Sequence, residues 1–422
     1  MNTAPGREYT LRRLHYGYVV LVLVVLTVFV SLGLGRFGYA TILPAMQEGM
    51  KLTNAQTGAL QSWNLIGYLS TVLLAGLLAT RFGPRVVIAI SLLIASAGMI
   101  LTGLFPTYAG ARVGRFVAGV GGAGGNVPAM ALVSAWFAPR RRGIATGVAV
   151  GGSSVGLMFT GLIIPRLLDA GGSERWRLCW YVLGAIGCCV AVVCALFLRD
   201  RAEEMGLKPI GESGQGQGHA QLANRTNAPG LSEVVASKVL WHLAAIYFAF
   251  GFSYIIYATF FVRYLVKEVG FSNAMAGNLW FLTGVVSGAS GYIWGALSDK
   301  WGRRTGLVIV FALQGISFLL LGLCRQMAAV WISAGIFALT SWSIPALMAA
   351  LAGDVFGADR APAALGLMTI VFGGGQVLGP WLAGRIADTT YSFTSAFTLA
   401  GMVALVWGAG GSFLVSTTEQ KR

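Results

Sequence analysis

The sequence predicts an all-α integral membrane protein with twelve transmembrane helices in two six-helix, pseudo-symmetric bundles. Three observations predict it. The 422 residues are 56% apolar and only 11% charged, whereas soluble domains are about 45–50% apolar and about 25% charged. Apolar runs long enough to cross a bilayer alternate with polar breaks. One long break divides these runs six and six. This composition excludes soluble enzymes, DNA-binding domains and disulfide-framed secreted modules.

The twelve predicted spans are apolar runs of about 20 residues or more between polar breaks. They cover residues 17–45, 56–79, 86–104, 108–135, 144–167, 176–198, 240–265, 273–297, 306–324, 328–353, 363–386 and 393–415. The long break contains Gly-Glu-Ser-Gly-Gln-Gly-Gln-Gly, which is typical of a flexible linker. The sequence therefore predicts an N-terminal bundle over 1–198, a cytoplasmic linker over 199–238 and a C-terminal bundle over 239–422.

The net charge of +15 comes from basic residues that gather on one side of the predicted membrane. Basic clusters follow even-numbered spans, for example Arg140-Arg141-Arg142 and Arg303-Arg304. An excess of Lys and Arg marks the cytoplasmic side. We therefore expect a multi-pass membrane protein with both termini in the cytoplasm and no nucleic-acid partner. The first apolar run is too long for a cleaved signal peptide, so it should remain as a span.

Residue patterns that carry enzyme chemistry are missing from the sequence. The five cysteines lie in or beside apolar spans, at spacings that suit neither a disulfide frame nor a zinc site. There is no Walker loop, and no Ser/His/Asp or Cys/His set at matching depth. We therefore expect no enzymatic activity, no cofactor and no bound metal.

Short motifs recur at a nearly constant offset between the two halves. Thr53-Asn54-Ala55 recurs as Ser272-Asn273-Ala274, and Arg166-x-x-Asp169 recurs as Arg385-x-x-Asp388, both 219 positions later. Tyr39-Ala40-Thr41 recurs as Tyr257-Ala258-Thr259 at an offset of 218. A constant offset across several spans indicates that the chain is a duplicated six-helix unit.

The loop after the eighth span reads Gly295-Ala-Leu-Ser-Asp299-Lys-Trp-Gly302-Arg303-Arg304. It resembles the loop motif G-x-L-x-D-R/K-x-G-R-R/K of the major facilitator superfamily. The first-half copy keeps Gly76, Arg81 and Gly83 but has Thr80 in place of the aspartate. The resemblance implies a gating role in which the aspartate accepts from a neighbouring helix N-terminus or pairs with an arginine across the cytoplasmic gate. The alternative is a basic turn that only sets topology. The candidate gating residues are Gly76, Arg81, Gly83, Gly295, Asp299, Gly302 and Arg303.

A second resemblance lies in the first two spans. Gly33-Leu-Gly35-Arg36-Phe37-Gly38-Tyr39, followed by Leu43-Pro44 and Asn64-x-x-Gly67-Tyr68, is similar to the poorly characterised bacterial YbfB-like permeases. This resemblance implies a major facilitator fold, with the substrate near the bilayer midplane between the two halves. The resemblance also implies a location in a bacterial inner membrane, and we expect the protein to act as a monomer in the lipid bilayer.

Arg36 is the outstanding polar residue of the predicted spans. It lies well inside the first span, whereas all 15 carboxylates fall in loops, tails or the last turn of a helix. An unpaired arginine at that depth costs about 3 kcal/mol. The sequence supplies no counter-charge, which points to an anionic substrate. The alternative is that Arg36 extends outward or satisfies carbonyls at a kink near its flanking glycines.

A second arginine would favour a doubly charged substrate. Sugar-phosphate exchangers of this superfamily have an arginine in the first helix and a second arginine in the seventh. Here the seventh-helix residue equivalent to Arg36 is Tyr254. This departure favours a singly charged acid. Arg263 lies nine residues further along and is expected at the rim or gate. Arg115 resembles the arginine of the fourth-helix motif R-x-x-Q-G-x-G, with Ala118 replacing Gln. It is either a second anion contact, part of a proton-linked network, or a side chain lying along the outer interface.

Hydroxyl, amide and indole groups recur at helical spacing near the predicted midplane, in positions that suit a carboxylate on a small organic body. Besides the two arginines, the candidate binding residues are Tyr39, Gln61, Asn64, Asn126, Tyr254, Tyr257, Trp280, Trp342 and Gln376, with Tyr68 on the same face as Gln61 and Asn64. The alternative is ordinary hydrogen bonding between helices.

These observations favour a secondary transporter that moves a small organic monoanion by alternating access, as a proton symporter or an anion exchanger. The alternatives are a drug/proton antiporter, which the many aromatic residues favour, and a non-transporting membrane sensor. The fifth span lacks the Gly-Pro ending of the antiporter motif, and no span contains a mid-membrane carboxylate. Both absences count against drug export.

Overall fold

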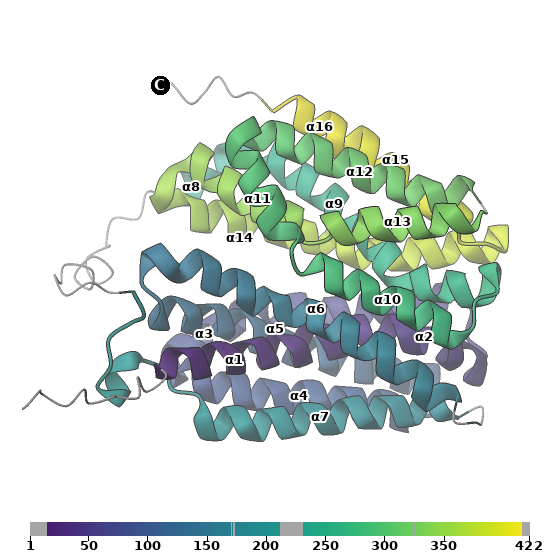
Figure 1. Cartoon of the computed structure of the whole chain (residues 1–422), viewed down its shortest axis with the longest axis horizontal. Coiled ribbons are helices and arrows are strands. Elements are labelled where there is room, and N and C mark those ends of the chain that lie inside the picture. Colours follow the sequence, from purple (N-terminus) through teal and green to yellow (C-terminus); the bar gives the residue numbers. More distant parts are fainter. Residues whose placement is uncertain (1–14, 170, 172–173, 212–230, 325, 416–422) are drawn as a thin grey trace, which may run out of the picture.

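The structure, a computed structural model, describes residues 15–169, 171, 174–211, 231–324 and 326–415. The described chain is almost entirely helical, with one isolated bridge between Phe137 and Ile210. The helices form two packed groups, from the first and second halves of the sequence (Figure 1). This is the predicted arrangement of two six-helix bundles.

Six spans make up the first group. The first span contains α1, a π-helical segment η1 and α2, which follow one another without a break. The elements are α1 (Tyr16–Val28), η1 (Phe29–Phe37), α2 (Gly38–Gly49), α3 (Asn54–Phe82), α4 (Pro84–Leu104), α5 (Tyr108–Trp136), α6 (Pro139–Asp169) and α7 (Arg175–Phe197).

The second group contains the remaining six spans in less regular form. Its elements are α9 (Lys238–Tyr264), η3 (Leu265–Val269), α10 (Asn273–Ser287), α11 (Ser290–Trp301), α12 (Arg303–Leu323), α13 (Met327–Thr340), α14 (Ser343–Thr390), α15 (Thr394–Met402), η4 (Val403–Ala409) and α16 (Gly410–Phe413). Among the described residues, 11 helices are long and apolar enough to cross a membrane. The one predicted span missing from these 11 is the eighth, because a break at Gly288–Ala289 divides it into the shorter helices α10 and α11.

The predicted tenth span begins as α13 and, after a turn at Ser341–Trp342, continues into α14, which also contains the predicted eleventh span. Gly357, inside this helix, has a non-helical conformation (φ 73°, ψ 165°), so two helices meet there. Such a positive φ is readily adopted by glycine. Gly83 and Gly302, equivalent positions in the two halves, likewise have nearly identical backbone angles (φ 84° and 89°). The matching turns support the internal duplication.

The first part of the predicted linker is folded against the first group. The backbone N–H of Ile210 donates to Trp136 O at 2.9 Å, and Ala138 N–H donates to Ile210 O at 3.1 Å. The indole of Trp136 donates to Arg199 O at 2.9 Å. The polar run predicted to be flexible, residues 212–230, lies outside the described residues, as do the basic N-terminal residues. A short helix, α8 (Leu231–Ala236), follows before α9.

The two groups touch closely at the end of the molecule where α2 turns into α3. A Cβ added to Gly58 would lie 2.0 Å from Pro380 O, and one added to Gly277 would lie 2.3 Å from Gly161 O. Small residues allow such backbone contact between membrane helices. At the other end of α6 and α14, a Cβ added to Gly147 or Gly353 would meet no atom within 4 Å. The described contacts between the groups therefore concentrate at one end.

Candidate functional site

Arg36 lies in the π-helical segment η1 of the first span. Its side chain is only 7% exposed, and its Nε and Nη2 atoms are buried without a hydrogen-bond partner in the described chain. Short π-helical segments are frequent at functional sites because they change the direction of side chains. Arg36 therefore combines a buried positive charge with unused donors.

Residues from both groups surround the Arg36 guanidinium. Its Cζ lies 4.5 Å from the centre of the Tyr68 ring, a cation–π contact within the first group. The Tyr68 hydroxyl accepts from Asn126 Nδ2 at 3.0 Å. From the second group, the Tyr254 hydroxyl interacts electrostatically with Arg36 and accepts a hydrogen bond from Gln376 Nε2. Arg36 thus lies where the two halves meet.

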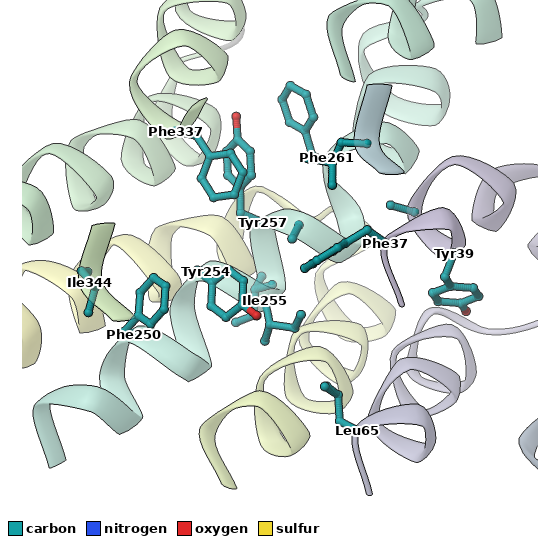
Figure 2. Close-up of a cluster of buried hydrophobic side chains, with 14 of the residues drawn as sticks. Phe37, Tyr39, Leu65, Phe250, Tyr254, Ile255, Tyr257, Phe261, Phe337 and Ile344 are labelled. Atoms are coloured by element: carbon teal, nitrogen blue, oxygen red, sulfur yellow. The ribbon is translucent and has the colours of Figure 1, made fainter. Parts of the chain in front are cut away.

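An aromatic stack borders this position on the side of the second group. The Tyr254 ring stacks on Phe250 with centroids 4.5 Å apart, and Tyr247 stacks on Phe372 at 4.3 Å. Figure 2 shows Phe250 and Tyr254 along α9, with Phe37 of the first span at the same cluster. The site therefore has a cationic side and an apolar, aromatic side, the combination found in pockets for small organic molecules.

The structure brings together four of the predicted binding residues: Arg36, Asn126, Tyr254 and Gln376. Trp342 lies beside this set, because its ring centre is 5.4 Å from that of Phe37. The Trp342 indole also donates to Ser154 Oγ at 3.1 Å. It therefore contacts the opposite half through both its ring and its N–H.

Arg115 does not occupy the outer interface, which was one of its three predicted environments. It is completely buried, which excludes a position along the outer interface. Its Nη1 donates to Gly35 O and its Nη2 to Gln61 Oε1, both at 2.8 Å. Its Cζ also lies 4.7 Å from the Tyr39 ring centre and 5.2 Å from that of Trp180. Arg115 is a structural residue within the first group in this conformation.

Two further predicted binding residues belong to the same internal network. Asn64 Nδ2 donates to Arg115 O at 3.1 Å, which ties α3 to α5. The Tyr39 hydroxyl donates to Thr57 O at 2.8 Å. With Gln61 bound to Arg115, these side chains hydrogen-bond within their own half. They correspond to the interhelical hydrogen bonding considered as the alternative.

Tyr257 and Trp280 lie inside the second group. The Tyr257 hydroxyl bonds to Ser333 Oγ at 3.1 Å, and its ring stacks on Phe337 at 4.1 Å. Trp280 is fully buried, with its ring centre 6.1 Å from that of Phe261. Figure 2 shows Tyr257 and Phe337 side by side. Neither residue joins the Arg36 set in this conformation.

The predicted gating aspartate pairs within its own half. Asp299 forms an ion pair with Arg303 at 2.5 Å, and Arg303 also reaches Ser298 Oγ at 2.6 Å and Asp354 at 3.5 Å. Among the described residues, Asp299 does not pair with an arginine of the opposite half, as the gating prediction had it. The loop glycines Gly295 and Gly302 have open space around them.

The first-half copy of the loop obtains its carboxylate from elsewhere in the chain. Asp200, just after α7, accepts from the Arg85 N–H at 2.7 Å, at the N-terminus of α4. It therefore supplies the charge that Thr80 lacks, beside Gly83. Arg81 lies over the neighbouring Phe82 ring at 5.4 Å, and Gly76 faces Val127. Sequence reasoning missed Asp200 because it lies far from the motif along the chain.

Three aromatic residues at the site, Tyr247, Phe250 and Phe372, were not among the predicted binding residues. The seven-residue spacing of Tyr247 and Tyr254 places them on one helix face, which could have identified the first of these. Nothing in the sequence places Phe372, on α14, in their stack. Within the described residues, no group of three or more His, Cys, Asp or Glu side chains could hold a metal ion.

A family model described as "Uncharacterised MFS-type transporter YbfB" matches residues 28–410. The chain belongs to this family of major facilitator transporters. The crystal structure of a bacterial homolog of the human lysosomal transporter Spinster, in an inward-facing and unoccupied conformation, has a TM-score of 0.74 to it. That similarity covers 94% of this chain and 96% of that one at 19% identity, and it shows the shared fold.

Named relatives of this family member are transporters. A probable sulfoacetate transporter of Cupriavidus necator is 25% identical over 96% of this chain and 95% of the relative. A hexuronate transporter of Bacillus subtilis is 24% identical, with 88% of each chain covered. Monocarboxylate transporter 3 of Rattus norvegicus is 27% identical over 82% of this chain and 68% of the relative.

Proposed function

We propose that this protein is a secondary transporter that moves a small organic monoanion, a carboxylate, across the bacterial inner membrane by alternating access. Both termini lie in the cytoplasm, and residues 199–238 connect the bundles 1–198 and 239–422. Arg36 binds the carboxylate. The observation that carries the proposal is its buried guanidinium, with Nε and Nη2 unpartnered, between the two halves.

The electrostatics of the site favour an anion. An unpaired arginine in the membrane interior costs about 3 kcal/mol by insertion scales. In the described part of the chain, Arg36 has no ion pair with a carboxylate, and the second buried arginine, Arg115, interacts with it repulsively. A bound carboxylate would offset the free-energy cost of burying the positive charges of Arg36 and Arg115. Guanidinium binds carboxylate with two parallel hydrogen bonds, which suits the two free nitrogen atoms.

The other groups at the site fit the rest of such a substrate. The Tyr254 hydroxyl and the Gln376 amide offer polar contacts beside Arg36. The aromatic stack of Tyr247, Phe250, Tyr254 and Phe372 offers apolar surface for an organic body. The named relatives transport sulfoacetate, hexuronate or monocarboxylates by their descriptions, all of which are organic anions.

The membrane potential constrains the mode of transport. Importing one negative charge against a negative-inside potential costs about 2.3 kcal/mol per 100 mV. Uptake therefore requires a co-transported proton or exchange for another anion. We propose one of these two modes, with the protein acting as a monomer.

Transport by proteoliposomes tests the proposal. Vesicles loaded with an unlabelled acid are assayed for uptake of the labelled acid, using a panel of short monocarboxylates, hexuronates, sulfoacetate and inorganic phosphate. Tetraphenylphosphonium represents the cationic drugs of the alternative function. We expect counterflow of a carboxylate by the wild type and by Arg140→Gln, an exposed control, and none by Arg36→Gln. Uptake of the lipophilic cation alone, unchanged in Arg36→Gln, would favour drug export instead.

A further inference from the structure

The duplicated motifs contact each other crosswise at the closed end of the transporter. Asp388, in the last turn of α14, accepts from the backbone N–H groups of Asn54 and Ala55 at 2.8 and 2.9 Å. Asp169, its equivalent at the end of α6, accepts from Asn273 Nδ2 at 3.3 Å. Asn54 and Asn273 are the first residues of α3 and α10. Each aspartate therefore binds the start of a helix in the opposite half.

The glycines beneath these contacts follow the same symmetry. Gly58, one turn after Asn54, packs against Pro380, while Gly277, one turn after Asn273, packs against Gly161. Gly58 and Gly277 are 219 positions apart, as are Gly161 and Pro380. Close backbone packing at both places brings each helix start within reach of the opposite aspartate.

The two contacts differ in strength. Asp388 accepts two charge-assisted backbone hydrogen bonds at a helix N-terminus, where the helix dipole also favours a negative charge. Asp169 accepts one longer bond from a side-chain amide at an exposed position. The duplication thus supplies two equivalent contacts, of which one is much better formed.

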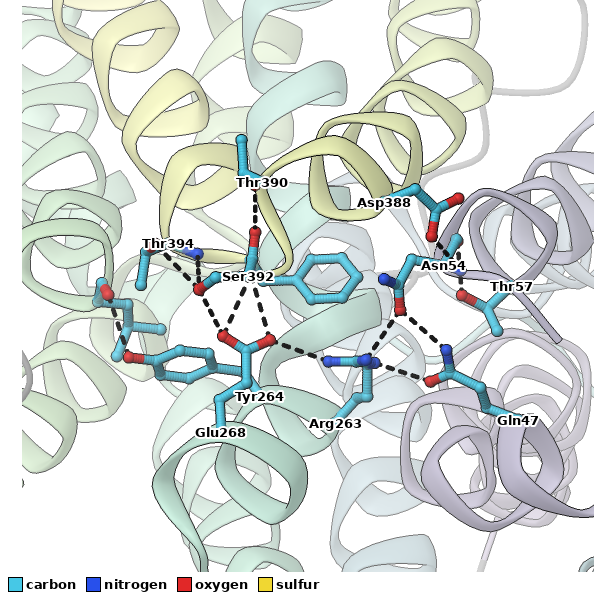
Figure 3. A network of polar contacts seen from close by, with 12 residues as sticks. Gln47, Asn54, Thr57, Arg263, Tyr264, Glu268, Asp388, Thr390, Ser392 and Thr394 are labelled. Carbon is cyan, nitrogen blue, oxygen red and sulfur yellow. Dashed lines mark hydrogen bonds and ion pairs between the residues drawn. The ribbon is translucent and has the colours of Figure 1, made fainter. Parts of the chain in front are cut away.

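Arg263 reinforces the stronger contact. From α9 in the second half, it donates to Gln47 Oε1 and to Asn54 Oδ1, each at 2.8 Å. Its position is fixed by Glu268, which accepts from Nη1 at 2.9 Å (Figure 3). The nearby Lys267–Glu48 pair also joins the halves, but its side chains are 36% and 72% exposed, so it contributes little.

We propose that Asp388 and Arg263 form a latch that holds this end of the transporter closed, and that Asp169 is its weak counterpart. Opening this end requires α3 to leave Asp388, which exposes the first N–H groups of α3 and frees Arg263 from Gln47 and Asn54. The latch therefore sets the population of the state open at this end. The inference does not depend on which substrate the protein carries.

Distance measurements between the halves test the latch. Spin labels are attached at Lys51→Cys, in the turn before α3, and Thr389→Cys, at the end of α14, in a full-length protein whose five cysteines are replaced. Both positions are exposed. Double electron–electron resonance in lipid nanodiscs then gives the fractions of the closed and open distances. The matched variants are Asp388→Asn and Asp169→Asn, with Arg263→Gln as a third.

We expect Asp388→Asn to raise the open-to-closed ratio about tenfold, the effect of weakening hydrogen bonds to a charged group. Arg263→Gln should act in the same direction, and Asp169→Asn should change the ratio less than twofold. Equal shifts for the two aspartate variants, or no shift in either, would overturn the latch. The Asp388→Glu variant, which keeps the charge, should recover part of the closed population. If Asp388→Glu loses as much of the closed population as Asp388→Asn does, the negative charge does not hold this end closed, and the proposal is overturned.

Discussion

Arg36 and Arg115 are both buried arginines of the N-terminal half, yet they are bound in opposite ways. Arg115 donates to Gly35 O and Gln61 Oε1 and lies against two aromatic rings. Arg36 leaves Nε and Nη2 without a partner and faces the second half. The difference teaches that depth and charge alone do not identify a binding residue. The hydrogen-bond partners decide whether an arginine is structural or available.

The two arginines are also connected. Arg115 binds the carbonyl of Gly35, the residue directly before Arg36, within the π-helical segment. A π-helical turn disturbs the regular i to i−4 hydrogen bonds of a helix. Arg115 therefore stabilises the distorted turn that presents Arg36. Arg115, whose donors are largely paired, thus helps to position Arg36, whose Nε and Nη2 are unpaired.

The largest effect on stability is expected for Arg115→Met. This change removes two hydrogen bonds made by a charged donor. It leaves the buried acceptors Gly35 O and Gln61 Oε1 without the Arg115 donor. We expect the free energy of unfolding to fall by about 3–5 kcal/mol. Thermal unfolding of the purified protein in detergent measures this, with Arg81→Gln as the exposed control. An unchanged melting temperature would contradict the structural role given to Arg115.

A smaller loss of stability is expected for Gln61→Leu. The substitution leaves Arg115 Nη2 buried without its acceptor but keeps the bond from Nη1 to Gly35. The expected destabilisation is about 1–3 kcal/mol, measured in the same thermal assay. If Gln61→Leu instead abolished ligand binding in a protein of unchanged stability, Gln61 would belong to the binding site after all.

The main effect of Tyr254→Phe is expected on binding, with a smaller loss of stability because the buried Gln376 amide loses its acceptor. The variant removes the hydroxyl that lies between Gln376 and Arg36 but keeps the ring stacked on Phe250. We expect the affinity for the carboxylate to fall about tenfold, as for one lost hydrogen bond to a charged group. Titration calorimetry measures the change. Tyr257→Phe, whose hydroxyl contacts Ser333 inside the second half, is the matched control and should bind as the wild type does.

The sequence predicted the fold well because hydropathy and repetition are local signals. Apolar runs of sufficient length must become helices in a bilayer, since every backbone polar group has to be paired internally. The break at Gly288–Ala289, inside the predicted eighth span, could not be predicted, because glycine is common in membrane helices and rarely interrupts them. The junction at Gly357, in contrast, falls within the predicted break between spans 328–353 and 363–386. Asp200 was missed for a related reason: its contact with α4 depends on how the chain returns after α7.

The candidate site was predicted only in part. Arg36 stood out because a charge inside a span is rare, and Tyr254 because it is the repeat partner of Arg36. The predicted depth of a residue in the membrane could not distinguish Asn126 and Gln376, which lie at the site, from Asn64 and Gln61. The latter two form hydrogen bonds within the first half only. The rotation of each helix about its axis decides that outcome. This rotation is set by packing against neighbouring helices, so a single sequence does not reveal it.

The most direct test of the central claim is ligand binding by Arg36→Gln beside the wild type. Binding of the carboxylate identified by counterflow is measured by calorimetry, and unfolding of both proteins is measured without ligand. In the described chain Arg36 has no carboxylate partner and loses only its contacts with Tyr68 and Tyr254. The account therefore predicts at most a small change in stability and an affinity at least about 100-fold lower, as for two charge-assisted hydrogen bonds. Arg140→Gln, at an exposed position, should match the wild type in both assays. An Arg36→Gln protein that binds the carboxylate with undiminished affinity would contradict the account.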